Sequence, residues 1–143
     1  MIDWANPKHK ISKYFTLKEA LYLPTWNRMA TEEDGLNEPV KINLLRLFNK
    51  MDEVREFLGK PIYVHVAYRP AEYNALVGGA PMSAHVSGKA ADWDCREDCD
   101  LTREKLLPEL YRLDMRMENK PKSNWVHLDT AHVRPGANRF FYP

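Results

Sequence analysis

The chain has 143 residues, a hydrophobic fraction of 44% and a net charge of +1, from 21 basic and 20 acidic side chains. A chain of this length buries one core, so we expect a single domain over residues 1–143. The balanced charge, without a basic run, gives no basis for binding nucleic acid. No apolar stretch approaches the ~20 residues that cross a bilayer. We therefore expect neither a nucleic-acid partner nor membrane insertion, and we expect a monomer.

Residues 1–15 lack the apolar core of a secretory signal peptide. We therefore expect synthesis in the cytoplasm, without an export route of the protein's own. Cys95 and Cys99 are expected to be free thiols in a surface loop, because nothing else in the sequence indicates an oxidising compartment. These two cysteines alone would also lack the further ligands of a structural zinc site.

Two helices are predicted in the first half of the chain. Thr16 and Glu19 have the spacing of a capping box and predict a short helix, because Pro24 follows. Pro39 suits the first turn of a longer helix that ends at Gly59. Its apolar residues are spaced three and four apart and predict a face buried in the core. They are Val40, Leu44, Leu47, Phe48, Met51, Val54 and Leu58.

The second half of the chain alternates strands with shorter helices. Strands are predicted at 62–68, 89–95 and 125–129, because these runs are apolar, β-branched or alternating. A short helix is expected from 70 to 77, and a longer one from an N-cap at Asp100 to Leu113. The connections are too short for repeated βαβ units. The sequence therefore predicts an α+β fold with a small, mostly antiparallel sheet flanked by helices.

Two histidines and an aspartate form the candidate metal set. His85 and Asp92 lie in a segment rich in small residues, and His127 lies on a predicted strand. Two imidazoles and one carboxylate are a common catalytic zinc set, with a fourth position left for water. One carboxylate against a divalent ion leaves a net positive centre, which acidifies water and polarises a carbonyl. Spacing alone leaves open that these are ordinary hydrogen-bonded histidines.

The pattern S-x-H-x-x-G-x-A-x-D, followed by W-V-H, resembles the zinc D-alanyl-D-alanine carboxypeptidase family. That family includes phage L-alanyl-D-glutamate endopeptidases, and its wider group includes the hedgehog signalling domain. The resemblance implies a hedgehog-like zinc peptidase fold. It covers nearly the whole chain, with further matches in residues 14–19, 58–62, 68–79 and 127–130.

By this resemblance His85, Asp92 and His127 are the ligands of a zinc ion (Zn²⁺). The implied activity is hydrolysis of an amide bond in the stem or cross-link peptides of bacterial peptidoglycan. A phage endolysin that acts at the cell wall fits a chain without a signal peptide, and so does a cytosolic recycling enzyme. The resemblance leaves open which bond is cut, and whether the action is that of a carboxypeptidase or an endopeptidase.

The resemblance also implies three residues around the metal. Arg69 matches an arginine expected to take part in catalysis by recognising a substrate carboxylate or carbonyl, for which its planar fork of donors is suited. The alternative for Arg69 is a structural ion pair. Ser83 and Asn74 are candidates for binding substrate or orienting the ligands, and each could equally cap a loop.

The sequence departs from the family at the general base. Many members carry a glutamate three residues before the last histidine ligand, or a histidine two before it, where this chain has Asn124 and Trp125. Glu118 is the nearest preceding glutamate, nine residues before His127. Asp129 is the best replacement, because a residue two positions after His127 shares its strand face. Its alternative role is to hold the His127 ring.

Other polar residues are weaker candidates. His65 and His132 are expected to be structural, and Asp94 shares a strand face with Asp92, where it supports a ligand or is solvated. The missing glutamate keeps a second function open. That alternative is a non-catalytic, zinc-containing domain of the same fold that binds a peptide or protein.

Overall fold

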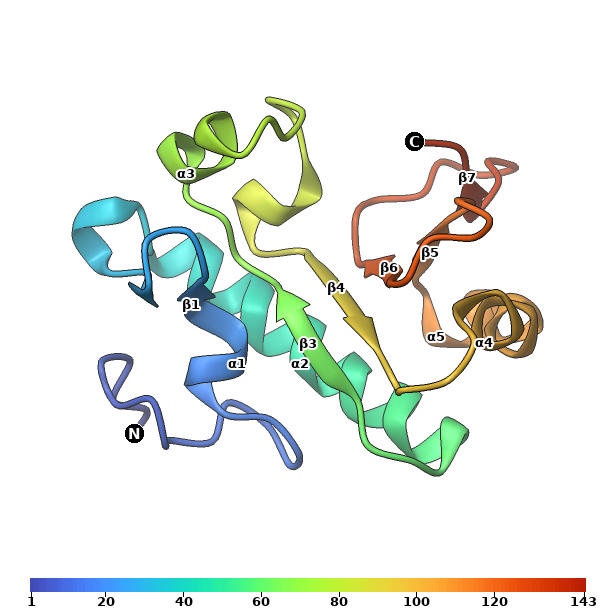
Figure 1. Cartoon of the computed structure of the whole chain (residues 1–143), viewed down its shortest axis with the longest axis horizontal. Helices are drawn as coiled ribbons and strands as arrows, with labels where there is room; N and C mark the ends of the chain where they lie inside the picture. The colour runs from blue at the N-terminus through green and yellow to red at the C-terminus, as the bar shows by residue number, and fades with distance from the viewer.

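A computed structural model describes residues 1–143 and shows an α+β fold around a five-stranded sheet (Figure 1). Neighbouring strands are antiparallel except β5 and β7, which are parallel. The α+β class and the mostly antiparallel sheet are therefore confirmed. The strands lie in the spatial order β3 (Tyr63–Val66), β4 (Ala90–Asp94), β6 (Val126–Asp129), β5 (Arg116–Glu118) and β7 (Phe140–Phe141).

Both predicted N-terminal helices are present. α1 (Leu17–Leu21) begins with the expected capping box, in which the side chains of Thr16 and Glu19 each accept the other's backbone N–H. α2 (Glu38–Leu58) ends at Gly59, whose φ of +69° favours glycine. The apolar side chains of α2 pack in one core with those of the sheet. Figure 1 shows α2 behind β3 and β4, so this helix covers one face of the sheet.

The two faces of the sheet differ in character. Trp93 on β4 and Leu128 on β6 are fully buried in the core with α2. Because side chains alternate along a strand, Asp92 and His127 point to the opposite face. These two residues are direct partners in the antiparallel register of β4 and β6. The sheet therefore places two of the three predicted ligands side by side, on the face that α2 does not cover.

Shorter elements connect these parts. A hairpin of β1 (Tyr22–Leu23) and β2 (Arg28–Met29), with the 3-10 turn η1 (Glu32–Asp34), separates α1 from α2 and was not predicted. Between β3 and β4 lie α3 (Ala71–Leu76), close to the expected helix, and the 3-10 turn η2 (Ala84–Ser87). No helix of this structure combines the length and apolarity needed to cross a bilayer.

The helix predicted from Asp100 differs from the expectation in two ways. The side chain of Asp98, not Asp100, caps it by accepting two backbone N–H groups. Pro108, which has no N–H to continue the helical bonds, lies in a 3-10 turn that divides it. The pieces are α4 (Cys99–Leu106), η3 (Leu107–Glu109) and α5 (Leu110–Leu113).

The two cysteines are free, as expected, but their predicted surface position is wrong. Cys95 and Cys99 are both buried and belong to the hydrophobic core. They lie where β4 turns into α4, and this junction packs against the sheet. Free cysteine behaves as a small apolar side chain, which explains its burial.

Candidate metal centre

His85 is held by the loop before β4 in a fixed orientation. Ser83 precedes η2, and its hydroxyl accepts the backbone N–H of His85 at 3.2 Å. The ring of His85 is buried, with Nδ1 2.7 Å from the carbonyl oxygen of Ala67. A carbonyl oxygen only accepts, so Nδ1 carries the hydrogen and donates it. In the neutral ring the lone pair is therefore on Nε2, which lies 3.2 Å from Oδ1 of Asp92.

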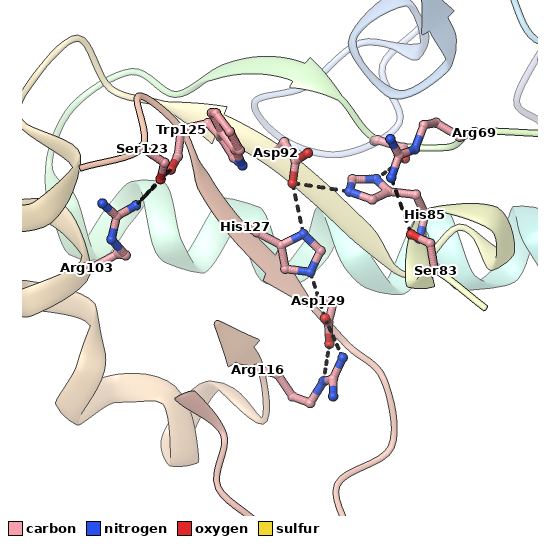
Figure 2. A network of polar contacts seen from close by, with 11 residues as sticks. Arg69, Ser83, His85, Asp92, Arg103, Arg116, Ser123, Trp125, His127 and Asp129 are labelled. Carbon is pink, nitrogen blue, oxygen red and sulfur yellow. Dashed lines mark hydrogen bonds and ion pairs between the residues drawn. The ribbon is translucent and has the colours of Figure 1, made fainter. Parts of the chain in front are cut away.

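His127 reaches the same carboxylate oxygen from β6. Its Nδ1 lies 2.9 Å from Oδ1 of Asp92, so three candidate ligand atoms of His85, Asp92 and His127 converge within 4.8 Å of one another (Figure 2). The outward nitrogen of each ring bonds a fixed acceptor, the carbonyl of Ala67 or the carboxylate of Asp129. Metal-binding histidines are usually held in this way. The donor set therefore fits a divalent metal such as zinc.

The charges of the metal-free site show how strongly these groups interact. Burial opposes ionisation of Asp92, but its close contacts with the rings of His127 and His85 outweigh it and hold the pKa of Asp92 well below its usual range. Burial also opposes protonation of His127, yet its hydrogen bonds to Asp129 and Asp92 raise its pKa to about 9. At neutral pH the metal-free His127 ring is thus a cation. A metal has to displace this proton in order to bind.

Asp129 lies on the far side of the His127 ring from Asp92. It is fully buried, and its Oδ2 is 2.8 Å from Nε2 of His127. The sequence expectation gave Asp129 two alternative roles, as the base or as a support for the ring. Because the imidazole separates its carboxylate from the metal-facing Nδ1, the geometry favours the support.

Arg116 holds the carboxylate of Asp129 and was not among the residues predicted from the sequence. Its guanidinium donates two hydrogen bonds to Asp129, at 2.8 and 2.9 Å (Figure 2). The ring of Phe141 packs 4.2 Å from the guanidinium and contacts the edge of the His127 ring, with centroids 5.8 Å apart. The pairing of Arg116 with Asp129 follows from the register of β5 and β6. No sequence signal could have found it without that strand.

Arg69 follows β3 and lies beside the metal site. Its backbone N–H donates to the carbonyl of His85 at 3.0 Å, and one terminal nitrogen lies 3.4 Å from the hydroxyl of Ser83 (Figure 2). Burial lowers the pKa of the guanidinium, and the charge of Asp92 opposes this shift. Its Nε is buried without a hydrogen-bond partner, and no carboxylate forms an ion pair with it. The buried Nε cannot reach another molecule, but the terminal nitrogen Nη1 makes no hydrogen bond in the chain and is the donor that remains for one.

Comparison with known protein families matches residues 14–129 to the family described as Peptidase M15. The match covers most of the chain and includes all three residues that could hold a metal. The chain belongs to the peptidase M15 family. Members of this family are metallopeptidases and are typically zinc dependent. A comparison with curated proteins found no match.

In this M15 peptidase, Ser83 and Asn74 have different surroundings. Ser83 contacts both Arg69 and His85, so it lies beside the candidate metal ligands. The buried amide of Asn74 instead donates to the carbonyl of Ala80 at 2.9 Å, and a Cβ at Gly79 would come within 2.0 Å of its oxygen. These contacts favour the loop-capping alternative for Asn74.

The three weaker candidates, His65, Asp94 and His132, lie outside the group of converging ligand atoms. His65 and Asp94 form a hydrogen bond between β3 and β4, so each has the other as its partner. Asp94 follows Asp92 by two residues on the same strand, and the pair therefore flanks the metal site. His132 is exposed beyond β6. None of these three joins the group of converging ligand atoms.

Proposed function

We propose that this M15 peptidase uses zinc to hydrolyse amide bonds in the stem or cross-link peptides of bacterial peptidoglycan. The observation that carries the proposal is the convergence of His85, Asp92 and His127 on one point from three separate elements. The assignment of these three residues as zinc ligands is part of the proposal. Family membership supports the reaction class, and the resemblance of the motifs supports the substrate.

Zinc bound here would polarise the substrate carbonyl and acidify the attacking water. The side chains of the protein would bind the substrate and hold the metal ligands in place. Arg69, whose Nη1 makes no hydrogen bond in the chain, would bind a substrate carboxylate or the negative charge that develops on the carbonyl oxygen. Ser83 holds both Arg69 and His85 in place. Asp129 accepts the Nε2 hydrogen of His127, so that Nδ1 keeps its lone pair toward the metal.

The charges around the site support hydrolysis. Asp92 contributes one negative charge to the metal site, and that of Asp129 is offset by its ion pair with Arg116. Against a divalent ion, one uncompensated carboxylate leaves a net positive centre. A divalent ion held there would stabilise the negative charge that develops on the substrate.

The alternative function is a zinc-containing domain that binds a peptide or protein without cleaving it. The observation that favours it lies before His127, where Asn124 and Trp125 offer no group that can take a proton from water. Asp129 is engaged by Arg116 and His127 and does not fill this gap. Turnover of a defined substrate separates the two functions.

The test uses zinc-loaded protein, purified peptidoglycan and defined muropeptides, with products identified by mass spectrometry. We expect new amino and carboxyl termini and no new reducing sugar ends, because a metal site replaces the paired acids of a glycosidase. The masses also identify the bond and distinguish carboxypeptidase from endopeptidase action. Clearing of permeabilised cells by added protein would support a role as a phage endolysin.

Two variants control for the metal. His85→Ala is expected to lose zinc and activity together, whereas His132→Ala, at an exposed histidine outside the site, is expected to keep both. Wild-type activity that survives thorough chelation would contradict zinc dependence. New reducing ends with intact peptides would contradict the substrate bond. Binding of muropeptides without any cleavage would favour the alternative function.

A further inference from the structure

Glu118 lies on the strand next to that of His127, a strand that the sequence did not predict. It is the last residue of β5, which pairs with β6 in an antiparallel register of Arg116 with Asp129 and Met117 with Leu128. Continuing this register by one residue places Glu118 opposite His127. Directly opposite residues in such a pair have Cβ atoms about 4.5–5.5 Å apart.

The side chain of Glu118 shares a face with the candidate ligands. Met117 is fully buried in the core, so its neighbours on β5 point to the other face of the sheet. Arg116 shows this directly, because its guanidinium reaches Asp129 on that face. The parallel register with β7 pairs Glu118 with Phe141, whose ring contacts the His127 ring. Both registers thus place Glu118 on the same face of the sheet as His127, on the strand next to it and on the side opposite Asp92.

Glu118 differs from the other carboxylates on this face because it has no partner. Its side chain is half-buried and makes neither a hydrogen bond nor an ion pair within the chain. Asp129 is bound by Arg116 and His127, Asp94 is paired with His65, and Asp92 is a candidate ligand. A base must have a free lone pair within reach of the proton that it abstracts. Glu118 is the carboxylate here that keeps one.

We propose that Glu118 is the general base of the hydrolysis, an inference that rests on the proposed function. As the oxygen of the attacking water bonds to the carbonyl carbon, Glu118 takes a proton from that water. The C–N bond then breaks, and Glu118 gives the proton to the leaving amine nitrogen. One water and one amide yield one carboxylic acid and one amine, and Glu118 is restored. No oxidant, reductant or further reactant is needed.

The experiment compares Glu118→Gln and Glu118→Asp with Glu104→Gln, a control at an exposed glutamate on α4. Zinc affinity, melting temperature, kcat and KM are measured on a muropeptide that the wild type cleaves. We expect Glu118→Gln to lower kcat by roughly 10²–10⁴-fold, the usual contribution of general acid–base catalysis. KM, zinc affinity and melting temperature are expected to stay near wild type. Glu118→Asp keeps a carboxylate on a shorter side chain, so its kcat is expected to lie between those of wild type and Glu118→Gln. The kcat of Glu104→Gln is expected to match wild type.

Two outcomes would overturn the assignment while leaving the proposed function intact. One is a Glu118→Gln variant whose kcat stays within about twofold of wild type, against the 10²-fold minimum expected of a base. The other is loss of activity in proportion to lost zinc, which would make Glu118 a support of the metal site. Wild-type protein that binds zinc but leaves peptidoglycan peptides intact would overturn the proposed function, and this inference with it. That failure is visible before any variant is compared.

Discussion

Asp129→Asn separates the two roles that the sequence leaves open for this residue. In the wild type, Oδ1 accepts from Nε of Arg116 and from the backbone N–H of Ala131, and Oδ2 accepts from Nη2 of Arg116 and from His127. An amide offers only one oxygen. If that oxygen keeps the Oδ1 position, the NH₂ group faces Nε2 of His127, and the neutral ring has to carry its hydrogen on Nδ1. That is the nitrogen facing Asp92, on the side where we propose that zinc binds.

The expected magnitude follows from these contacts. Mutation of a residue that holds a metal ligand typically costs 10–100-fold in metal affinity. At 1.4 kcal/mol per factor of ten, this is about 1.4–2.8 kcal/mol of binding free energy. The charge-assisted bonds from Arg116 to Asp129 also weaken, which lowers the free energy of unfolding by about 1.5–3 kcal/mol. For a chain of this size we expect a fall in melting temperature on the order of 5–10 °C.

The assay measures zinc affinity by competition with a chelator, and turnover per bound zinc. Asp52→Asn is the matched control, because Asp52 is also a buried carboxylate and accepts three hydrogen bonds from residues 12–14, outside the metal site. We expect it to lower stability without changing zinc affinity. If Asp129→Asn instead keeps full zinc affinity and loses turnover 10²-fold or more, Asp129 is the base and the reasoning from its geometry fails.

Four further predictions follow from the structure. Arg69→Lys and Arg69→Ala are expected to keep zinc and melting temperature near wild type while turnover falls, by roughly 10²–10³-fold in the alanine variant; a large fall in melting temperature would instead make Arg69 structural. Because the pKa of His127 is about 9 without metal, zinc affinity is expected to fall about tenfold per pH unit as the pH drops from 9 toward 6.5. The same raised pKa stabilises the metal-free protein below pH 6.5, and this stabilisation is lost as the pH rises through 9. Titration calorimetry measures the zinc affinity across this pH range, and melting curves measure the stability of the metal-free protein. A zinc affinity that does not change with pH would contradict the affinity prediction. Gly79→Ala is expected to lower the free energy of unfolding by about 1–3 kcal/mol, because the new Cβ would meet Asn74 at 2.0 Å, and an unchanged melting temperature would contradict this.

The elements predicted from sequence are those with local signals. The capping box at Thr16, the apolar stripe of α2 and the left-handed glycine at its end are set by residues within a few positions of one another. The strands β3, β4 and β6 each carry an apolar or alternating run of at least four residues. For these elements the local pattern and the tertiary packing agree.

Two strands that the sequence did not predict, β5 and β7, depend on distant partners. β5 has three residues and β7 has two, so neither has a run long enough to show a period. They are strands because β5 lies along the edge of β6 and β7 along the edge of β5. The buried positions of Cys95 and Cys99 have the same origin, because they depend on how the α4 junction packs and not on the polar residues between them.

The candidate ligands could be predicted from the sequence, whereas the candidate base could not, because it depends on a strand that has no local signal. Residue type and the resemblance of the motifs nominated His85, Asp92 and His127, and strand alternation placed Asp129 on the His127 side of its strand. Alternation does not tell which ring nitrogen a neighbour contacts, and this detail separates a base from a support. Nor does it reveal a residue on an adjacent strand. The register that brings Glu118 opposite His127 exists only once β5 is placed, and a glutamate nine residues upstream then becomes a cross-strand neighbour.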